Sequence, residues 1–219
     1  MLSRSVFIVV ALLLLTPQLG SAQSFFEKTG QFILDVFLPS GYPEGLELRR
    51  ELRSREWKAY HVTVDDTEAM DAIYRRAYEL CQGDSKAAML ASALSVLDHR
   101  TIPFLLPRGF ELNIPLTIES EEEFNQRVGS LPATIYTRRI DDRDKLQHFF
   151  FSAYLKRVFG MNWLCRTVGD IVEFGEDLFV IGAVSDPRDK HANNDGIQFS
   201  AEAAMSPNAR PSESLTDNP

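Results

Sequence analysis

The chain has 219 residues, with 23 Lys and Arg against 31 Asp and Glu, so its formal net charge is −8. An acidic chain without a basic cluster is a poor candidate for binding nucleic acid or for adsorbing to an anionic membrane by charge. The length is sufficient to bury one sizeable hydrophobic core.

The first residues have the pattern of a secretory signal peptide. Arg4 precedes an apolar run at 6–15, and the small residues Gly20 and Ala22 lie at the expected cleavage positions. We therefore expect cleavage near Ala22, which removes residues 1–22, and a mature protein that is exported to the periplasm or secreted. No cysteine stands at the cleavage site to accept a lipid. Retention of this segment as an N-terminal anchor is the alternative.

The segment after the signal is rich in phenylalanine. Phe25, Phe26, Phe32 and Phe37 fall on one face of the helical segment predicted at 24–39. Such a face either docks on the protein's own core or enters a membrane interface. The polar face lacks the basic excess of interfacial helices, so we favour docking on the core.

Three helices are expected in the next part of the chain. A charged helix is predicted at 47–58, and Asp65 with Glu68 forms a capping box that opens a helix ending near Cys81. Asp84 then caps a helix at 85–100. The short connection predicts that the last two helices form an antiparallel hairpin.

Residues 103–138 change character. Pro103, Pro107 and Pro115 exclude a long helix, and the segments 104–106, 110–116 and 133–137 suit short strands. A capping box of Ser120 and Glu123 opens a short acidic helix between the strands. We interpret this region as a small β-insertion.

Two apolar helices near the C-terminus each carry a polar stripe. The helix at 141–160 places Asp144 and His148 one turn apart. In the helix at 163–184, four ionisable residues share one face because they recur at i, i+4, i+7 and i+11: Arg166, Asp170, Glu173 and Asp177. Helices this apolar should be buried, so their ionisable side chains need partners. We expect the two helices, together 141–184, to face each other through these stripes.

The stripes have several interpretations. Asp144, His148, Glu173 and Asp177 offer one imidazole and three carboxylates, which suits zinc, manganese or iron. The same groups without a metal can act as a general acid and base. The favoured interpretation is a structural polar network, and a solvated stripe is the remaining one. Other polar residues of this region join the network: Lys145, Arg166, Asp170, Glu176, Asp189, His191 and Asn193.

Three further features concern the cysteines and the C-terminal region. Cys81 and Cys165 either form a disulfide or are two buried thiols. Residues 191–202 imitate a calcium-binding loop, but His191 is a poor first ligand, and we favour an Asn-Asp-Gly turn. After Phe199 the chain has few large apolar residues, so residues 199–219 are predicted to be disordered.

The same late residues carry a resemblance to a known family. The chain resembles the YfiM-like bacterial envelope lipoproteins and, more distantly, VanZ-like membrane proteins. The resemblance covers 144–196 and depends on Asp144, Lys145, His148, Phe149, Glu173, Asp177, Asp189, Asn193 and Gly196. It implies a location in the cell envelope. The family has no established activity, so it implies no catalytic residues.

These observations predict a mainly α-helical single domain at 23–198 with a β-insertion at about 103–138. No familiar enzyme signature is present, and whether the protein is an enzyme stays open. The leading hypothesis is an exported envelope protein whose buried Asp/His/Glu network is structural or binds a partner. One alternative is a metal-dependent hydrolase acting on an envelope lipid or glycan. Another is a peripheral membrane protein that binds through its Phe-rich helix.

Overall fold

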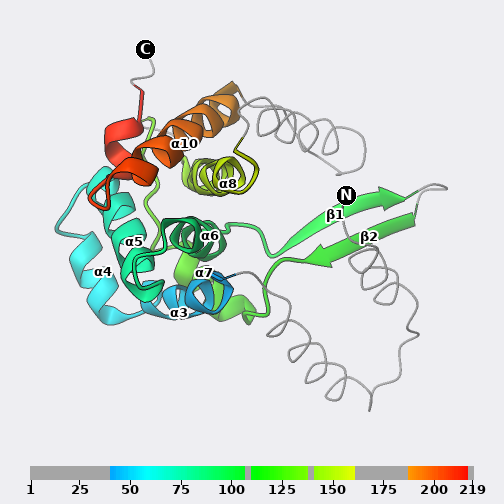
Figure 1. Cartoon of the computed structure of the whole chain (residues 1–219). Coiled ribbons are helices and arrows are strands. Elements are labelled where there is room, and N and C mark those ends of the chain that lie inside the picture. Colours follow the sequence, from blue (N-terminus) through cyan, green and yellow to red (C-terminus); the bar gives the residue numbers. More distant parts are fainter. Residues whose placement is uncertain (1–39, 107–109, 138–140, 161–186, 217–219) are drawn as a thin grey trace. The chain divides into compact units, whose positions relative to one another are not determined.

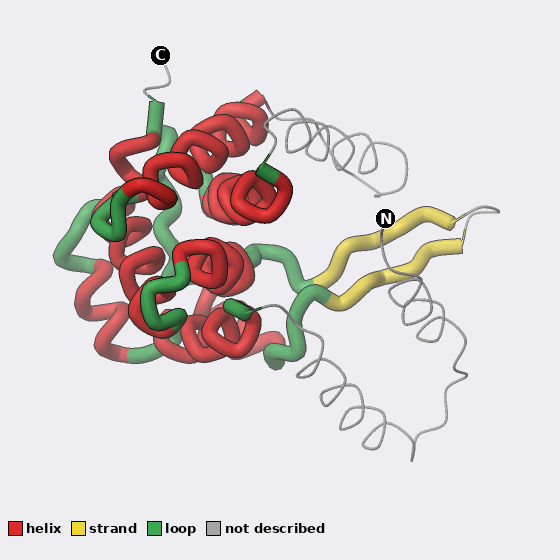
Figure 2. Tube along the Cα trace, in the orientation of Figure 1, coloured by secondary structure: helices red, strands yellow, loops and turns green. Residues whose placement is uncertain are grey.

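A computed structural model describes residues 40–106, 110–137, 141–160 and 187–216 (Figure 1). These residues belong to one structural unit that begins at Pro39. They form a mainly helical domain with a two-stranded sheet, so the predicted fold class is confirmed (Figure 2). The predicted signal peptide and Phe-rich helix lie outside the described residues. Within these ranges, no helix is long and apolar enough to cross a membrane.

The predicted charged helix is two helices. Helix α3 covers Tyr42–Leu52 and helix α4 covers Arg55–His61. The break lies at Ser54, whose hydroxyl accepts a hydrogen bond from the Trp57 amide and so caps α4. Gly41 precedes α3 with a φ of 107°, and an added Cβ there would lie 2.3 Å from the Ala87 carbonyl oxygen. A glycine is therefore required at this turn.

The next two helices begin where their capping residues predict. Helix α5 covers Asp66–Leu80, and the Asp65 carboxylate accepts from the Glu68 amide at 2.8 Å. Helix α6 covers Ser85–Ser95, and Asp84 accepts from two amides of its first turn. The two helices pack against each other, as expected. However, α6 ends five residues earlier than the predicted 85–100 helix.

The predicted β-insertion is smaller than expected. Strand β1 covers Thr101–Leu106, strand β2 covers Phe110–Pro115, and they pair antiparallel with Phe104 opposite Leu112. Helix α7 covers Glu121–Val128 and begins at the predicted capping box. The third strand, at 133–137, was wrongly predicted.

Carboxylates explain the missing strand. The amides of Ala133 and Thr134 donate to Asp66, at 3.0 and 2.7 Å, and those of Tyr136 and Thr137 donate to Asp142. These amides are therefore satisfied without a neighbouring strand, and the segment is irregular.

The rest of the described chain is helical. Helix α8 covers Arg143–Phe159, helix α10 covers Pro187–Met205, and a 3₁₀-helix, η1, covers Pro211–Ser214. Helix α8 packs against α10 and α6 (Figure 1). The core between them is aromatic: the rings of Tyr74 and Phe199 meet edge to face at 4.7 Å, and Phe149 contacts both Phe150 and Phe199.

Two predictions about this end of the chain were wrong. Residues 199–216 are ordered, because Asp71, Glu202 and Asp195 accept hydrogen bonds from Ser212, Ser214 and Thr216. Residues 217–219 lie outside the described part. The Asn-Asp-Gly turn expected within 191–202 is absent, because these residues are the interior of α10. Its glycine, Gly196, gives close contact with α8 instead of a turn, since an added Cβ would lie 2.1 Å from the Phe149 carbonyl oxygen.

Candidate functional site at the α8–α10 interface

Helices α8 and α10 bring together motif residues that are far apart in the sequence. The Lys145 ammonium donates to Asp144 Oδ2 at 2.5 Å and to Asp189 Oδ1 on α10. The Lys145 side chain is only 1% exposed, and His148 Nε2 lies 3.6 Å from the same oxygen of Asp189. Asp144, Lys145, His148 and Asp189 thus form one ionic network.

Further polar contacts extend along this interface. On one side of the network, Arg188 donates to Asp142 Oδ1 at 2.7 Å. On the other, the Ser152 hydroxyl donates to Asn193 Oδ1 at 2.7 Å. Polar pairs therefore recur along the two helices, and each pair forms in only one register of α10 against α8.

The position of Lys145 bears on the metal hypothesis. Its ammonium lies between two carboxylates, where it supplies the positive charge that a bound cation would supply. Within the described ranges, no group of three or more His, Cys, Asp or Glu side chains is arranged to hold a metal ion. Asp144 and His148 are two members of the predicted ligand set.

The other two predicted metal ligands and part of the predicted polar network lie outside the described residues. It comprises the predicted ligands Glu173 and Asp177 and the network residues Arg166, Asp170 and Glu176. The expected contact between helices 141–160 and 163–184 is therefore also untested. The described partners of α8 are α10 and α6.

His191 belongs to a different contact. Its Nε2 lies 2.8 Å from the Thr216 hydroxyl, 3.0 Å from the Thr216 carbonyl oxygen and 3.7 Å from Asp195 Oδ2. These contacts attach the C-terminal segment to α10. His191 therefore does not join Lys145, contrary to the prediction of one network.

Cys81 is a free thiol at the end of α5. Of the two predicted possibilities, a disulfide or a buried thiol, Cys81 is a buried thiol. Cys165 lies outside the described residues. Burial raises the pKa of the Cys81 thiol to about 12, which suppresses the reactive thiolate.

The sequence reasoning missed a buried arginine cluster. Arg127 donates to both carboxylate oxygens of Glu119, and Arg53 donates to one of them at 2.6 Å. Arg127 also donates to the carbonyl oxygens of Ser95 and Leu97, at the end of α6. These bonds satisfy carbonyl groups at the helix end and account for the early termination of α6. The available signal was an arginine on the apolar face of α7, three residues after Phe124.

In this cluster the arginines outnumber the carboxylates, because Arg49, Arg53 and Arg127 all lie within 4.0 Å of Glu119. Burial favours the neutral form of Glu119 and so raises its pKa. The hydrogen bonds and the positive charge of Arg127 outweigh this effect, so the pKa of Glu119 lies below the usual 4.5. Burial and then the charge of Arg127 lower the pKa of Arg49 to about 10. A single carboxylate thus binds several guanidinium groups, and the cluster connects α3, α7 and the end of α6.

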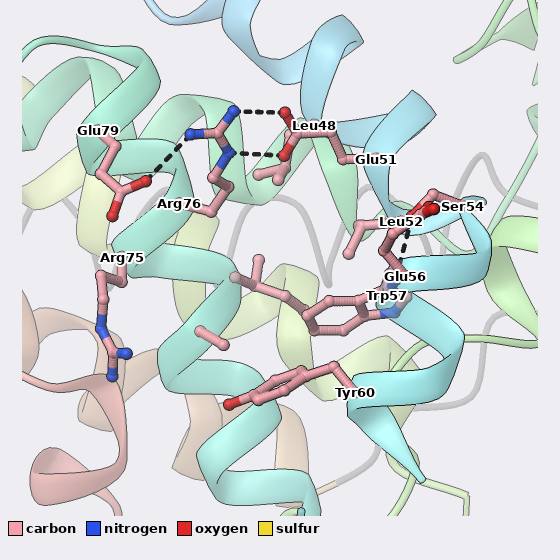
Figure 3. Close-up of a pocket in the computed structure, with 12 residues that line it drawn as sticks. Leu48, Glu51, Leu52, Ser54, Glu56, Trp57, Tyr60, Arg75, Arg76 and Glu79 are labelled. Carbon is pink, nitrogen blue, oxygen red and sulfur yellow. Dashed lines mark hydrogen bonds and ion pairs between the residues drawn. The ribbon is translucent and has the colours of Figure 1, made fainter. Parts of the chain in front are cut away.

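A groove of about 540 Å³ lies between α3, α4 and α5 (Figure 3). Trp57 and Tyr60 form one wall, and Arg76 bridges Glu51 and Glu79 at its rim. The Trp57 indole donates to the Ser130 carbonyl oxygen at 2.9 Å. The lining combines apolar and aromatic side chains with charged ones at the rim, a composition that suits a binding groove.

No protein-family model, curated protein or solved structure matches this chain. The family resemblance of residues 144–196 therefore stays a prediction. Its described members do lie together, because Lys145 contacts Asp189 and Gly196 lies against Phe149.

Proposed function

We propose that this chain is an exported envelope protein that acts by binding and that its α8–α10 ionic network is structural. The observation that carries this proposal is the Lys145 ammonium, which is buried between Asp144 and Asp189. A buried charge is tolerated when it is paired, and removal of one partner leaves the other uncompensated. Each ionic group described in this network already has a partner within it.

The arrangement supports a role in helix alignment. The pairs Arg188–Asp142, Lys145–Asp189 and Ser152–Asn193 link the same two helices at successive positions. A different register between α8 and α10 would leave all three pairs unmade. Satisfied polar networks of this kind favour one packing arrangement over its competitors.

The experiment is the substitution Lys145→Met, which keeps the unbranched shape of the side chain, shortens it by one atom and removes its charge. We expect the free energy of unfolding to fall by about 3–5 kcal/mol, because Asp189 then lacks its buried counter-charge. For a domain of this size the melting temperature should fall by roughly 10 °C. The matched control is Lys156→Met on the same helix, whose ammonium donates to the Gly160 carbonyl oxygen at the surface.

A double variant separates a structural role from other roles. Lys145→Met combined with Asp189→Leu replaces the more buried ion pair by apolar side chains, which is often close to neutral for stability. Asp144, the other carboxylate on Lys145, is 35% exposed, so water can solvate it in this variant. Recovery of most of the lost stability supports the proposal. If Lys145→Met melts like the wild-type protein, the network has no structural role and the proposal is wrong.

The location part of the proposal depends on residues 1–22 and on the family resemblance. Export predicts a mature N-terminus near Gln23. Mass spectrometry of the protein recovered from a periplasmic extract measures this directly. An intact Met1 terminus on that protein would favour the retained anchor instead.

A further inference from the structure

A second hollow lies between α5 and the loop at 206–210, away from the α8–α10 network. Its volume is about 330 Å³, and its lining includes Arg75, Tyr74 and Tyr78 from α5 with Asn208 and Arg210 from the loop. The lining is thus rich in hydrogen-bond donors, and two of its members carry a permanent positive charge.

The two guanidinium groups of this hollow are available to a ligand. Arg75 and Arg210 are exposed, and neither makes a hydrogen bond or an ion pair to any described residue. The neighbouring Arg76 differs, since Glu51 and Glu79 pair with it. Arg75 lines both this hollow and the groove shown in Figure 3. The chain has an excess of 8 negative charges, yet these two arginines have no acidic partner among the described residues. Their positive charge can therefore attract an anion.

The one carboxylate of the hollow is already engaged. Asp71 accepts hydrogen bonds from the Ser212 amide at 2.8 Å and from its hydroxyl at 2.7 Å. These bonds also hold the segment that follows Arg210 against α5. The Arg75–Arg210 hollow is therefore a consequence of the ordered C-terminal region.

Among the remaining donors, Tyr74 is held in place by the core. The Tyr74 ring packs edge to face on Phe199 and is 4% exposed, so its hydroxyl position is set by packing. Burial raises the Tyr74 pKa, and the charge of Arg157 on α8 opposes this rise. The Arg157 guanidinium thus contributes positive potential at the Tyr74 hydroxyl.

We propose that the Arg75–Arg210 hollow binds a phosphate group. Two guanidinium groups, two tyrosine hydroxyls and the Asn208 amide offer more donors than the two oxygens of a carboxylate can accept, and they suit a phosphate dianion. This proposal names a ligand class for the binding role proposed above. It shares no residue with the Lys145 network, so either proposal can fail without the other.

The test uses the full chain and two probes, inorganic phosphate and glycerol phosphate, in isothermal titration calorimetry. We expect saturable binding that Arg75→Gln and Arg210→Gln each weaken about tenfold, because each removes a charge-assisted hydrogen bond. The control is Arg55→Gln, which removes the same charge from an exposed position outside the hollow. Its affinity should equal that of the wild-type protein.

The two probes distinguish the sources of the phosphate group. Binding of both, or of glycerol phosphate alone, supports a site for phosphate esters, and binding of inorganic phosphate alone supports a site for the free ion. Absence of saturable binding by either probe overturns the proposal. It is also overturned if Arg75→Gln binds as tightly as the wild-type protein, or if acetate at equal concentration competes as well as phosphate does.

Discussion

Replacement of Gly196 by alanine tests the contact between α8 and α10. An alanine Cβ at this position would lie 2.1 Å from the Phe149 carbonyl oxygen and 2.9 Å from its carbonyl carbon. Real Cβ contacts do not fall below 3.0 Å, so the two backbones must separate by about 0.9 Å. Because the obstructing atoms belong to the backbone, no side chain can move aside to relieve the contact.

The size of the effect follows from two opposing terms. Overpacking of this kind costs about 3 kcal/mol. Alanine is favoured over glycine within a helix by about 1 kcal/mol. The free energy of unfolding of Gly196→Ala should therefore be about 2 kcal/mol lower than that of the wild-type protein, and the melting temperature should fall by roughly 4–8 °C.

The assay is urea unfolding followed by circular dichroism, with two control variants. Ala201→Gly lies on the exposed side of the same helix and should lose only the helix-propensity term, about 1 kcal/mol. Gly45→Ala in α3 has looser contacts, the nearest at 3.1 Å to Leu94 Cβ, so its loss should be smaller than that of Gly196→Ala. If Gly196→Ala is as stable as the wild-type protein or more so, the close packing of α8 on α10 described above is incorrect.

Glu119→Gln should lower the free energy of unfolding by about 3 kcal/mol, because Arg127 loses its buried counter-charge, and an unchanged urea midpoint would contradict this. Since the pKa of Glu119 is lowered on folding, its stabilising effect is complete above its usual pKa of 4.5 and is lost as the pH falls through the lower value. Urea midpoints measured between pH 7 and 3 should thus fall more steeply for the wild-type protein than for Glu119→Gln. Cys81 should react with iodoacetamide at pH 8 only after unfolding, and mass spectrometry of Cys165→Ser protein would reveal any faster labelling. Protein purified without chelator should lack stoichiometric metal because Lys145 supplies the cation, whereas metal that is lost on His148→Ala would favour the hydrolase alternative.

Much of the helical framework could be predicted because the relevant signals are local. Asp65, Asp84 and Ser120 each accept a hydrogen bond from an amide two or three residues away, and the helices begin beside them. A capping interaction of this kind needs only a few residues of sequence. The break at Ser54 had the same kind of signal and was overlooked.

The candidate site could be predicted only in part. The sequence indicated that Asp144, Lys145 and His148 share a buried helix and need partners. It suggested the 163–184 helix as the source of those partners, and the described partner is Asp189 on α10. Periodicity identifies a polar face, but it does not identify which of several later segments will cover that face.

The sequence by itself determined that this chain is mainly helical, where α5, α6 and α7 begin, and that the ionisable side chains of the 141–160 helix need partners. Tertiary structure decided how distant groups pair. Lys145 and Asp189 are 44 residues apart, Arg127 and Ser95 are 32 apart, and Asp71 and Ser212 are 141 apart. It also decided that residues 199–216 are ordered, since Asp71 on α5 and two carboxylates of α10, Asp195 and Glu202, supply hydrogen-bond acceptors to the last segment. The physical reason is that a buried polar group is satisfied by whichever partner packing brings within about 3 Å, and sequence spacing sets that distance only within a single helix or turn.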